Sequence, residues 1–220
     1  MLDHHIQREI HHRLSHTKSL RFSELQPEGI ENKLFDYHLK KTLSSGLIEK
    51  NDDGSYSLSA TGRRIGPETL KDVKTAVDKA YSLLLIAMRH PDGTWLLLRR
   101  TTFPQIDKVG FLQVKPVAGR PVLDQATEYL LGLGISSPTV HVHAHGYLTA
   151  LDPQEAVESF VHFTLLRAEY AALPPQLPEG YTWVKQSDFK SHDMLASTNV
   201  LLKLLEAPAG GFVDSTFQLS

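Results

Sequence analysis

The sequence predicts an α/β (α+β) chain in two parts: a helix-rich amino-terminal domain that closes with a small β-hairpin, and a mixed α/β domain after it. Three observations lead to this prediction. Residues 30–64 change from a four-residue apolar repeat to two short extended runs around an Asp-Gly turn. From Tyr81 onward the chain contains continuous apolar runs, which are typical of buried strands. The length of 220 residues suits two small domains.

The amino-terminal part predicts three helices in succession. Residues 3–16 carry apolar side chains four residues apart, which indicates a helix with one buried face. Residues 19–22 read as a short extended piece, and Ser23 is a suitable N-cap for a short second helix. The third helix has an apolar stripe at helical spacing, formed by Phe35, Leu39 and Leu43. His38 could face DNA or pack at the edge of this helix, and packing is the preferred interpretation.

A β-hairpin follows the third helix at once. The runs LIEK and SYSLS flank an NDDG turn, and a further helical stretch starts near Ser59 or Thr61, both good N-caps. The order of these pieces, "YHLK…SGLIEK…DGSYSLSATGRR", resembles the recognition helix and wing of small winged-helix regulators of the arsenic-repressor type. The resemblance implies a winged helix-turn-helix domain over residues 1–66 that binds double-stranded DNA.

The resemblance also implies which residues contact DNA. Side chains on the exposed side of the third helix would face the major groove, namely Asn32, Lys33, Asp36, Tyr37 and Lys40. Candidates for phosphate contacts are Lys41, Lys50, Asn51, Arg63 and Arg64. Asp36 would repel phosphate, and winged helices also serve as protein–protein modules. A protein-binding role therefore stays open as an alternative.

Composition limits the classes of function. The net charge of −2 argues against a general nucleic-acid coat, although residues 1–66 carry ten Lys and Arg against nine Asp and Glu. Without cysteine the chain has no disulfide, no thiolate nucleophile and no Cys-based zinc site. The amino end is polar, and no apolar run approaches the ~18 residues that a membrane span needs. We therefore expect a cytoplasmic protein with no membrane partner.

Residues 67–79 are polar, with apolar side chains at helical spacing, and we expect them to form a linking helix. In winged-helix repressors such a segment often helps to form the dimer. A homodimer would match a palindromic operator, because the symmetry of the protein and of the DNA would then agree.

The second part mixes strands and helices. Extended runs occupy residues 81–88, 95–100, 140–151, 159–170 and 179–189, the last leading into a helix. A helix over residues 121–135 places on one side Leu123, Ala126, Thr127, Leu130 and Leu131. A last helix over residues 197–206 turns inward Leu201, Leu204 and Leu205. This order predicts a layered α/β domain.

The segments "LLLIAMRHPDGTWLLLRR…VGFLQVKPVAGRPVLDQATEYLLGLGI…YTWV" resemble a Nudix domain over about residues 80–206. The resemblance implies an α/β/α sandwich, which we assign to residues 80–220. Anchoring the family signature on Gly134-Ile135 retains one glutamate, Glu128. The first glycine of the signature becomes Gln113 and its following glutamate becomes Gly119. The paired glutamates become Leu131 and Gly132.

In the family the paired glutamates bind magnesium, which positions the attacking water on a diphosphate. Leucine and glycine have no side-chain oxygen with which to bind magnesium or position water. No shift of the alignment register places an adjacent Glu pair in this helix. We therefore expect no catalytic residue, no metal site and no cofactor. Mg²⁺ enters only under the alternative, a Nudix-type hydrolase of nucleoside diphosphate derivatives with an accessory winged helix, for which Asp124 and Glu128 are the remaining carboxylates.

A pocket without catalysis can still bind a ligand. The candidates are Arg99 and Arg100 at a strand end, Lys115 in the loop before the helix, and Glu128. Guanidinium groups suit phosphate oxygens, although a solvated strand end explains the two arginines equally well. Base stacking by Trp95, Phe103 or Phe111 is the weaker expectation, because core packing suits an aromatic residue better.

Three histidines alternate along one predicted strand, His141, His143 and His145, so all three are expected on one face. Neighbours two residues apart could share a zinc ion with His162 as a cross-strand third ligand. An ordinary half-exposed strand face is the preferred interpretation, and the sequence does not decide between the two.

Together these features predict a transcriptional regulator. The winged helix would bind DNA, and the non-catalytic Nudix-like domain would bind a nucleotide-like small molecule or mediate dimerisation. Differential affinity of the ligand for the DNA-competent arrangement would be the switch.

Overall fold

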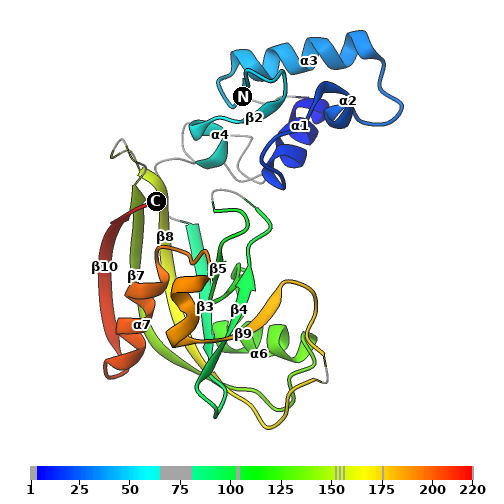
Figure 1. Ribbon diagram of the computed structural model, residues 1–220. Coiled ribbons are helices and arrows are strands. Elements are labelled where there is room, and N and C mark those ends of the chain that lie inside the picture. Colours follow the sequence, from blue (N-terminus) through cyan, green and yellow to red (C-terminus); the bar gives the residue numbers. More distant parts are fainter. Residues whose placement is uncertain are drawn as a thin grey trace. The chain divides into compact units, whose positions relative to one another are not determined.

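The computed structural model describes residues 4–64, 81–102, 105–151, 153, 155, 157–174 and 176–219. The chain divides into two compact units (Figure 1). Unit 1 comprises Met1–Lys79 with Thr101–Ile106, and unit 2 comprises Ala80–Arg100 with Asp107–Ser220. The linking helix expected at residues 67–79 lies outside the described residues. Among the described residues, no helix is both long and apolar enough to cross a membrane.

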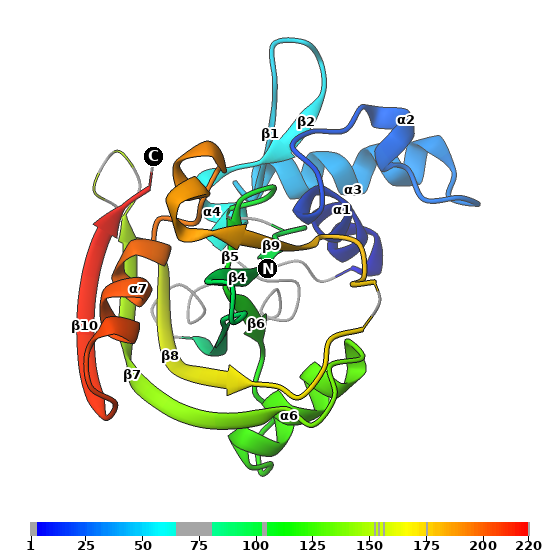
Figure 2. The ribbon, with the colours of Figure 1, turned by 60° about the horizontal axis from the view of Figure 1, so that its bottom comes forward.

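Unit 1 consists of short helices and one hairpin. Its elements are α1 (His5–Ser15), α2 (Phe22–Leu25), α3 (Asn32–Ser44), β1 (Ile48–Lys50), β2 (Tyr56–Leu58) and α4 (Ala60–Arg64). The two strands pair antiparallel, with Ile48 opposite Leu58, and form the hairpin predicted from the Asp-Gly turn (Figure 2). Ser59 caps α4, because its Oγ accepts a hydrogen bond from the amide of Gly62 at 3.0 Å.

The core of unit 1 forms where α1 and α3 meet. Ile6, Ile10 and Leu14 on α1 are fully buried, and Phe35 and Leu39 on α3 pack in the same cluster. The predicted apolar stripes of both helices are therefore confirmed. His38 is buried as expected, and its carbonyl oxygen accepts a hydrogen bond from the Thr42 hydroxyl at 2.7 Å, which satisfies a polar group inside the core.

The short second helix differs from its prediction. Ser23 lies inside α2, and Arg21 occupies the N-cap. The Glu24 carboxylate accepts a hydrogen bond from the Arg21 amide at 2.6 Å, so an acidic residue in the first turn supplies the capping acceptor. The extended piece expected at residues 19–22 is reduced to one antiparallel bridge between Leu20 and Tyr56.

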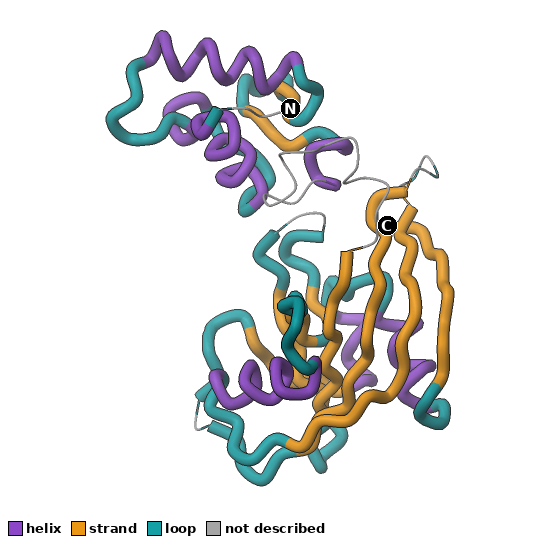
Figure 3. Tube along the Cα trace, turned by 180° about the vertical axis from the view of Figure 1, so that it is seen from behind, coloured by secondary structure: helices purple, strands orange, loops and turns teal. Residues whose placement is uncertain are grey.

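Unit 2 is a mixed α/β structure with two sheets. Its strands are β3 (Tyr81–Met88), β4 (Thr94–Arg99), β5 (Val109–Gly110), β6 (Leu112–Val114), β7 (Thr139–Leu151), β8 (Val157–Glu169), β9 (Tyr181–Lys185) and β10 (Gly211–Gln218). Its helices are α6 (Val122–Gly132), the 3₁₀ helix η2 (Gln186–Ser191) and α7 (Thr198–Glu206). The five-stranded sheet has the order β10-β7-β8-β3-β6 and is mixed, and the three-stranded sheet has the order β5-β4-β9 and is antiparallel (Figure 3).

Two apolar clusters hold these layers together. Alternate residues of β3 enter different clusters, with Leu85 on the α7 side and Ile86 on the α6 side. This strand is buried on both sides, as its continuous apolar run predicts. On α6, Ala126 and Leu130 are buried, whereas Leu123 and Leu131 are exposed. The apolar side predicted for this helix is therefore buried only in part, and its edges at Leu123 and Leu131 face solvent.

A β-bulge in β7 separates its histidines. The register against β8 shifts between Val142 and Ala144, so His143 is the extra residue. Val140 packs in the α6 cluster but Ala144 packs in the α7 cluster, which shows that the alternation reverses at the bulge. The expectation that His141, His143 and His145 share one face is thus wrong.

His143 is buried, and its Nε2 lies 2.8 Å from the carbonyl oxygen of Leu204 on α7. This contact ties the bulge to the end of a helix and gives His143 a structural role. Among the described residues, no group of three or more His, Asp or Glu side chains is arranged to hold a metal ion.

The sequence did not predict β10, which pairs parallel with β7 at one edge of the sheet (Figure 2). The close approach of the two strands depends on Gly146, because a methyl group at this position would overlap the carbonyl oxygen of Val213.

We predict that Gly146→Ala destabilises unit 2 by about 1–3 kcal/mol, because the overlap is with backbone and must displace β10. Urea unfolding followed by tryptophan fluorescence measures this loss, since Trp95 and Trp183 are both in unit 2. The matched control is Gly132→Ala, where an added methyl group meets no atom within 4 Å. Equal urea midpoints for the two variants would contradict the pairing of β7 with β10.

Candidate DNA-binding and ligand-binding sites

The helix α3 has two different sides. Phe35 and Leu39 face the core, whereas Tyr37 is 59% exposed and Lys33, Lys40 and Lys41 are exposed with it. Asn32 lies at the start of the helix, where its Oδ1 accepts a hydrogen bond from Gln26 Nε2 at 2.8 Å. The exposed side therefore presents cations and a phenol, which are groups that bind phosphates and base edges.

One of these cations already has a partner. Lys40 Nζ donates to Asp36 Oδ2 at 2.7 Å, one helical turn away on the exposed side. The hydrogen bond to Asp36 and the charge of that carboxylate raise the pKa of Lys40. DNA would therefore have to compete with Asp36 for this ammonium group.

The two hairpin residues predicted to contact phosphate, Lys50 and Asn51, differ in their surroundings. Lys50 is exposed, with its Nζ 5.8 Å from the centre of the Tyr56 ring. Asn51 instead supports the turn, because its Nδ2 donates to Ser55 Oγ at 2.9 Å and its Oδ1 accepts from Ser57 Oγ at 3.1 Å. Both ends of the Asn51 amide are therefore engaged within the hairpin.

Two arginines, Arg63 and Arg64, follow the hairpin. Arg63 donates from its guanidinium to the carbonyl oxygen of Leu58 at 3.0 Å, which ties α4 to β2. The side chain of Arg64 lies outside the described residues.

A cluster of histidines joins α1 to α3 behind the exposed side. The His4 and His38 rings stack with centroids 4.0 Å apart, and the His5 ring lies 4.3 Å from His4. His4 is also the N-cap of α1, because its Nδ1 accepts a hydrogen bond from the Ile6 amide. The cationic residues Arg8 and Lys41 lie close enough to act on the same rings.

These surroundings favour neutral imidazoles. Burial lowers the pKa of His4, and the nearby charges of His5, Arg8 and Lys41 lower it further. Burial likewise lowers the pKa of His38, with His4, Lys41 and His5 acting in the same direction. Protonation of His4 at Nδ1 would also remove the acceptor that caps α1.

In unit 2 the helix α6 is where the sequence resemblance expects metal-binding glutamates. The helix is followed by Gly134, which has a φ of 79°, and by the buried Ile135, so the anchor of the motif is a real helix end. Leu131 is 51% exposed, and Gly132 after it has no side chain. Asp124 and Glu128 are the carboxylates of this helix, too few for a hard cation that takes several oxygen ligands. The donor set of α6 therefore does not fit Mg²⁺.

Glu128 forms an ion pair with Arg120. Arg120 Nη2 lies 2.5 Å from Glu128 Oε1, and both side chains are largely exposed. Gln125 holds the loop before α6, since its Oε1 accepts from the Val117 amide at 2.6 Å and its Nε2 donates to the Arg120 carbonyl oxygen at 2.8 Å. The loop is thus fastened by a buried amide, a role that the sequence did not indicate.

The other predicted ligand-binding residues are dispersed. Arg100 is half-buried and donates to Gln113 Oε1 on β6 at 2.6 Å, and burial lowers its pKa. Lys115 is exposed in the loop after β6. Trp95 and Phe111 are buried against each other in the core, which confirms packing over base stacking, and Phe103 lies outside the described residues.

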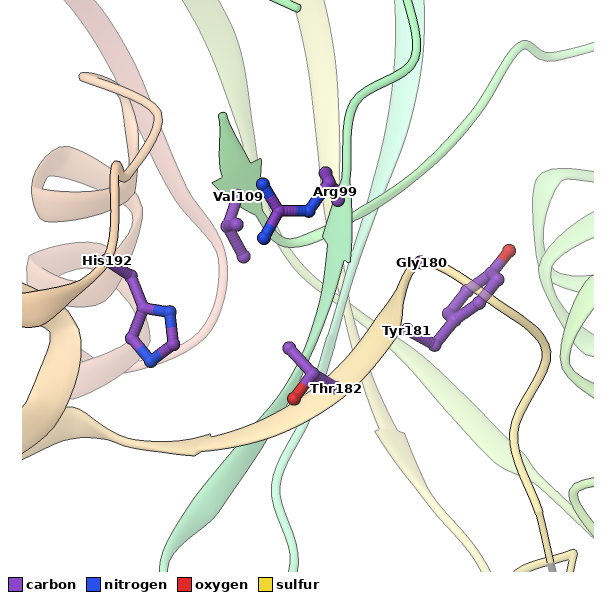
Figure 4. A pocket seen from close by; sticks show the side chains of 6 residues that line it. All are labelled: Arg99, Val109, Gly180, Tyr181, Thr182 and His192. Carbon is purple, nitrogen blue, oxygen red and sulfur yellow. The ribbon is translucent and has the colours of Figure 1, made fainter. Parts of the chain in front are cut away.

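Arg99 alone of this group lines a hollow of about 190 Å³ (Figure 4). The other lining residues are Val109, Gly180, Tyr181, Thr182 and His192. Sequence reasoning missed Thr182 and His192, because they are distant from Arg99 in the chain and have no motif of their own.

Comparison with known proteins gives a limited likeness. No family model and no curated protein sequence matches the chain. Among solved structures, it is similar to a MutT mutator protein from Bacillus halodurans, with 19% identity and a TM-score of 0.47 over 63% of this chain and 89% of that one. It is also similar to the Nudix domain of Shewanella oneidensis NrtR in complex with ADP-ribose, with 12% identity and a TM-score of 0.44 over 64% of this chain and 97% of that one. A longer structure of NrtR gives 13% identity and a TM-score of 0.45 over 56% of this chain and 61% of that one.

The histidine cluster predicts a pH dependence of unit 1. Because folding lowers the pKa of His4 and His38 below their ordinary value of 6.5, the unfolded state binds protons first as the pH falls. The free energy of unfolding is therefore full above about pH 6.5 and decreases below it. The urea midpoint of α1 and α3 amide resonances, measured from pH 7.5 downward, checks this expectation.

The variant His4→Asn/His38→Gln should make this pH profile less steep, since asparagine caps a helix without titrating. The buried His11, whose pKa is also lowered by burial, keeps the rest of the slope. The control is His12→Asn, which replaces an exposed histidine of the same helix. A profile as steep in the double variant as in the control would assign the pH dependence to other groups.

Proposed function

We propose that the chain is a DNA-binding transcriptional regulator. Residues 1–66 would be its winged helix-turn-helix domain, residues 67–79 a linking helix and residues 80–220 a non-catalytic Nudix-like domain. The observation that carries the proposal is the two-sided α3, whose exposed cations and Tyr37 lie opposite the buried Phe35 and Leu39. A hairpin with an exposed Lys50 follows this helix directly.

The dimensions of α3 suit the major groove. Its 13 residues span about 20 Å at ~1.5 Å per residue, and the groove of B-DNA is about 12 Å wide and admits a helix. Asn32, Lys33 and Tyr37 would then read base edges, while Lys41 and Lys50 contact phosphates on either side. Gln26, which holds the Asn32 oxygen, would orient the amide of Asn32 toward the groove.

The Nudix-like assignment of residues 80–220 rests on the order of elements. The chain runs from β6 through a loop fastened by Gln125 into α6, which ends at Gly134 beside a mixed sheet. The signature motif falls on this strand, loop and helix. Because α6 carries Leu131 and Gly132 at the positions of the paired glutamates, the alternative of a pyrophosphohydrolase receives no support from this helix.

Unit 2 would bind a nucleotide-like small molecule or mediate dimerisation. Arg100 supports a ligand role, because it is a half-buried cation whose Nε has no hydrogen-bond partner among the residues that the structure describes. A buried donor of this kind is costly unless an acceptor reaches it. A ligand that binds the DNA-competent and the DNA-incompetent arrangements with different affinities would change the affinity for DNA. By linkage, DNA would change the affinity for the ligand by the same factor.

We predict that Lys40→Ala/Lys41→Ala weakens binding to duplex DNA at least tenfold at low salt. The loss of the phosphate-facing charge of Lys41, and of the Lys40 charge that Asp36 partly offsets, should also reduce the slope of log affinity against log salt by roughly one to two. Fluorescence anisotropy of the full chain on random duplex DNA across a salt series measures both quantities.

The matched control is Lys185→Ala/Lys203→Ala, which makes the same change of net charge with two exposed lysines of unit 2. In the opposite direction, Asp36→Asn should tighten binding a few-fold, because it removes a carboxylate from the exposed side and frees Lys40. Equal weakening by both double variants would mean that net charge, and not α3, governs binding.

We also predict that ADP-ribose changes the DNA affinity of the chain without being consumed when Mg²⁺ is present. The physical reason is that a guanidinium such as that of Arg100 binds diphosphate oxygens, while α6 lacks the ligands for the metal. Anisotropy with and without the compound, together with chromatography of the compound after incubation, tests both parts. Magnesium-dependent cleavage would favour the hydrolase instead.

A further inference from the structure

The hollow lined by Arg99 is built from three elements of unit 2. Arg99 ends β4, Thr182 lies on the paired strand β9, and His192 follows η2 (Figure 4). The Arg99 amide donates to the carbonyl oxygen of Gly180 at 2.9 Å, and this residue, which directly precedes β9, has no side chain. This leaves open space beside the guanidinium.

The polar groups around this space have unused donors. The Arg99 guanidinium makes one hydrogen bond with the described residues, from Nη1 to the Asp107 carbonyl oxygen at 3.1 Å. An arginine has five N–H donors, so four remain. The Thr182 hydroxyl and the His192 ring make no hydrogen bond within the described part of the chain. Three different donor groups thus border one hollow.

The charge around the hollow favours an anion. No carboxylate lines it. Two acidic residues adjoin the lining in sequence, Glu179 before Gly180 and Asp193 after His192. Asp193 has its Oδ1 3.4 Å from Lys108 Nζ, so a cation shares its charge. A guanidinium beside an imidazole and a hydroxyl therefore presents a positive surface without a competing acid in its lining.

The volume of the hollow and the placement of its donors indicate which kind of anion fits it. Pockets for drug-sized ligands measure about 300–1,000 Å³, so a hollow of about 190 Å³ suits one small anionic group better than a whole nucleotide. Figure 4 shows Arg99, Thr182 and His192 around the space, each from a different part of the fold. Donors that surround a group match a tetrahedral oxyanion better than a planar carboxylate.

We infer that this hollow binds the terminal phosphate group of a small phosphorylated molecule. The Arg99 guanidinium supplies paired hydrogen bonds to two phosphate oxygens, and Thr182 and His192 donate to the others. This inference deepens the proposed ligand-binding role of unit 2 and does not depend on DNA binding. It is also separate from Arg100, whose guanidinium contacts Gln113 on β6 and does not line the hollow.

The test is a titration of the full chain with inorganic phosphate, followed by the proton resonance of the His192 ring. We expect saturable binding to the wild type, with at least tenfold weaker affinity for Arg99→Ala and a smaller loss for Thr182→Val, which removes only the hydroxyl. Acetate at the same ionic strength should bind more weakly than phosphate.

The matched control is Arg167→Ala, which removes an exposed strand arginine outside the hollow and should leave phosphate affinity unchanged. Equal affinities in Arg99→Ala and Arg167→Ala, or no saturation in the wild type, would overturn the inference. Because no DNA is present, a failure here is distinct from a failure of DNA binding, and Lys40→Ala/Lys41→Ala should bind phosphate normally.

Discussion

Unit 2 depends on the antiparallel pairing of β7 with β8, two strands of 13 residues each. The larger sheet extends from this pair on both sides, with β10 joined to β7 and β3 joined to β8, and β6 follows β3 at the far edge. The bulge at His143 lets a single long strand contribute to two cores, because the extra residue reverses which side chains face inward. One irregular residue thereby sets the packing of both helices on the sheet.

In unit 1, core packing likewise decides which side chains face solvent. Burial of Phe35 and Leu39 against α1 fixes the rotation of α3, and this rotation decides which side chains reach solvent. The exposed cations are therefore a consequence of core packing. The stacked rings of His4 and His38 belong to the same contact between α1 and α3. The protonation state of these rings is therefore physically linked to the orientation of the exposed side of α3.

The two units differ in how their polar groups are used. In unit 1 several predicted DNA contacts already have partners, such as Asp36 for Lys40 and Ser55 for Asn51. In unit 2, Glu128 is paired with Arg120, whereas Arg99 borders a hollow and makes one side-chain hydrogen bond within the described part of the chain. Hydrogen-bond donors without a described partner identify candidate binding positions better than residue type does. Charged side chains of the same types occur both in paired and in unpaired groups.

Elements with strong local signals could be predicted from the sequence. The stripes of α1 and α3, the Asp-Gly hairpin and the buried run of β3 follow from periodicity and turn chemistry. The position of β10, the bulge at His143 and the shared hollow of Arg99 and His192 became visible only in the folded chain. Strand pairing and pocket formation join residues distant in the chain, and no local pattern encodes those contacts. Exposure of Leu131 was likewise decided by packing, because a helical apolar pattern does not state which of its residues the neighbouring sheet can cover.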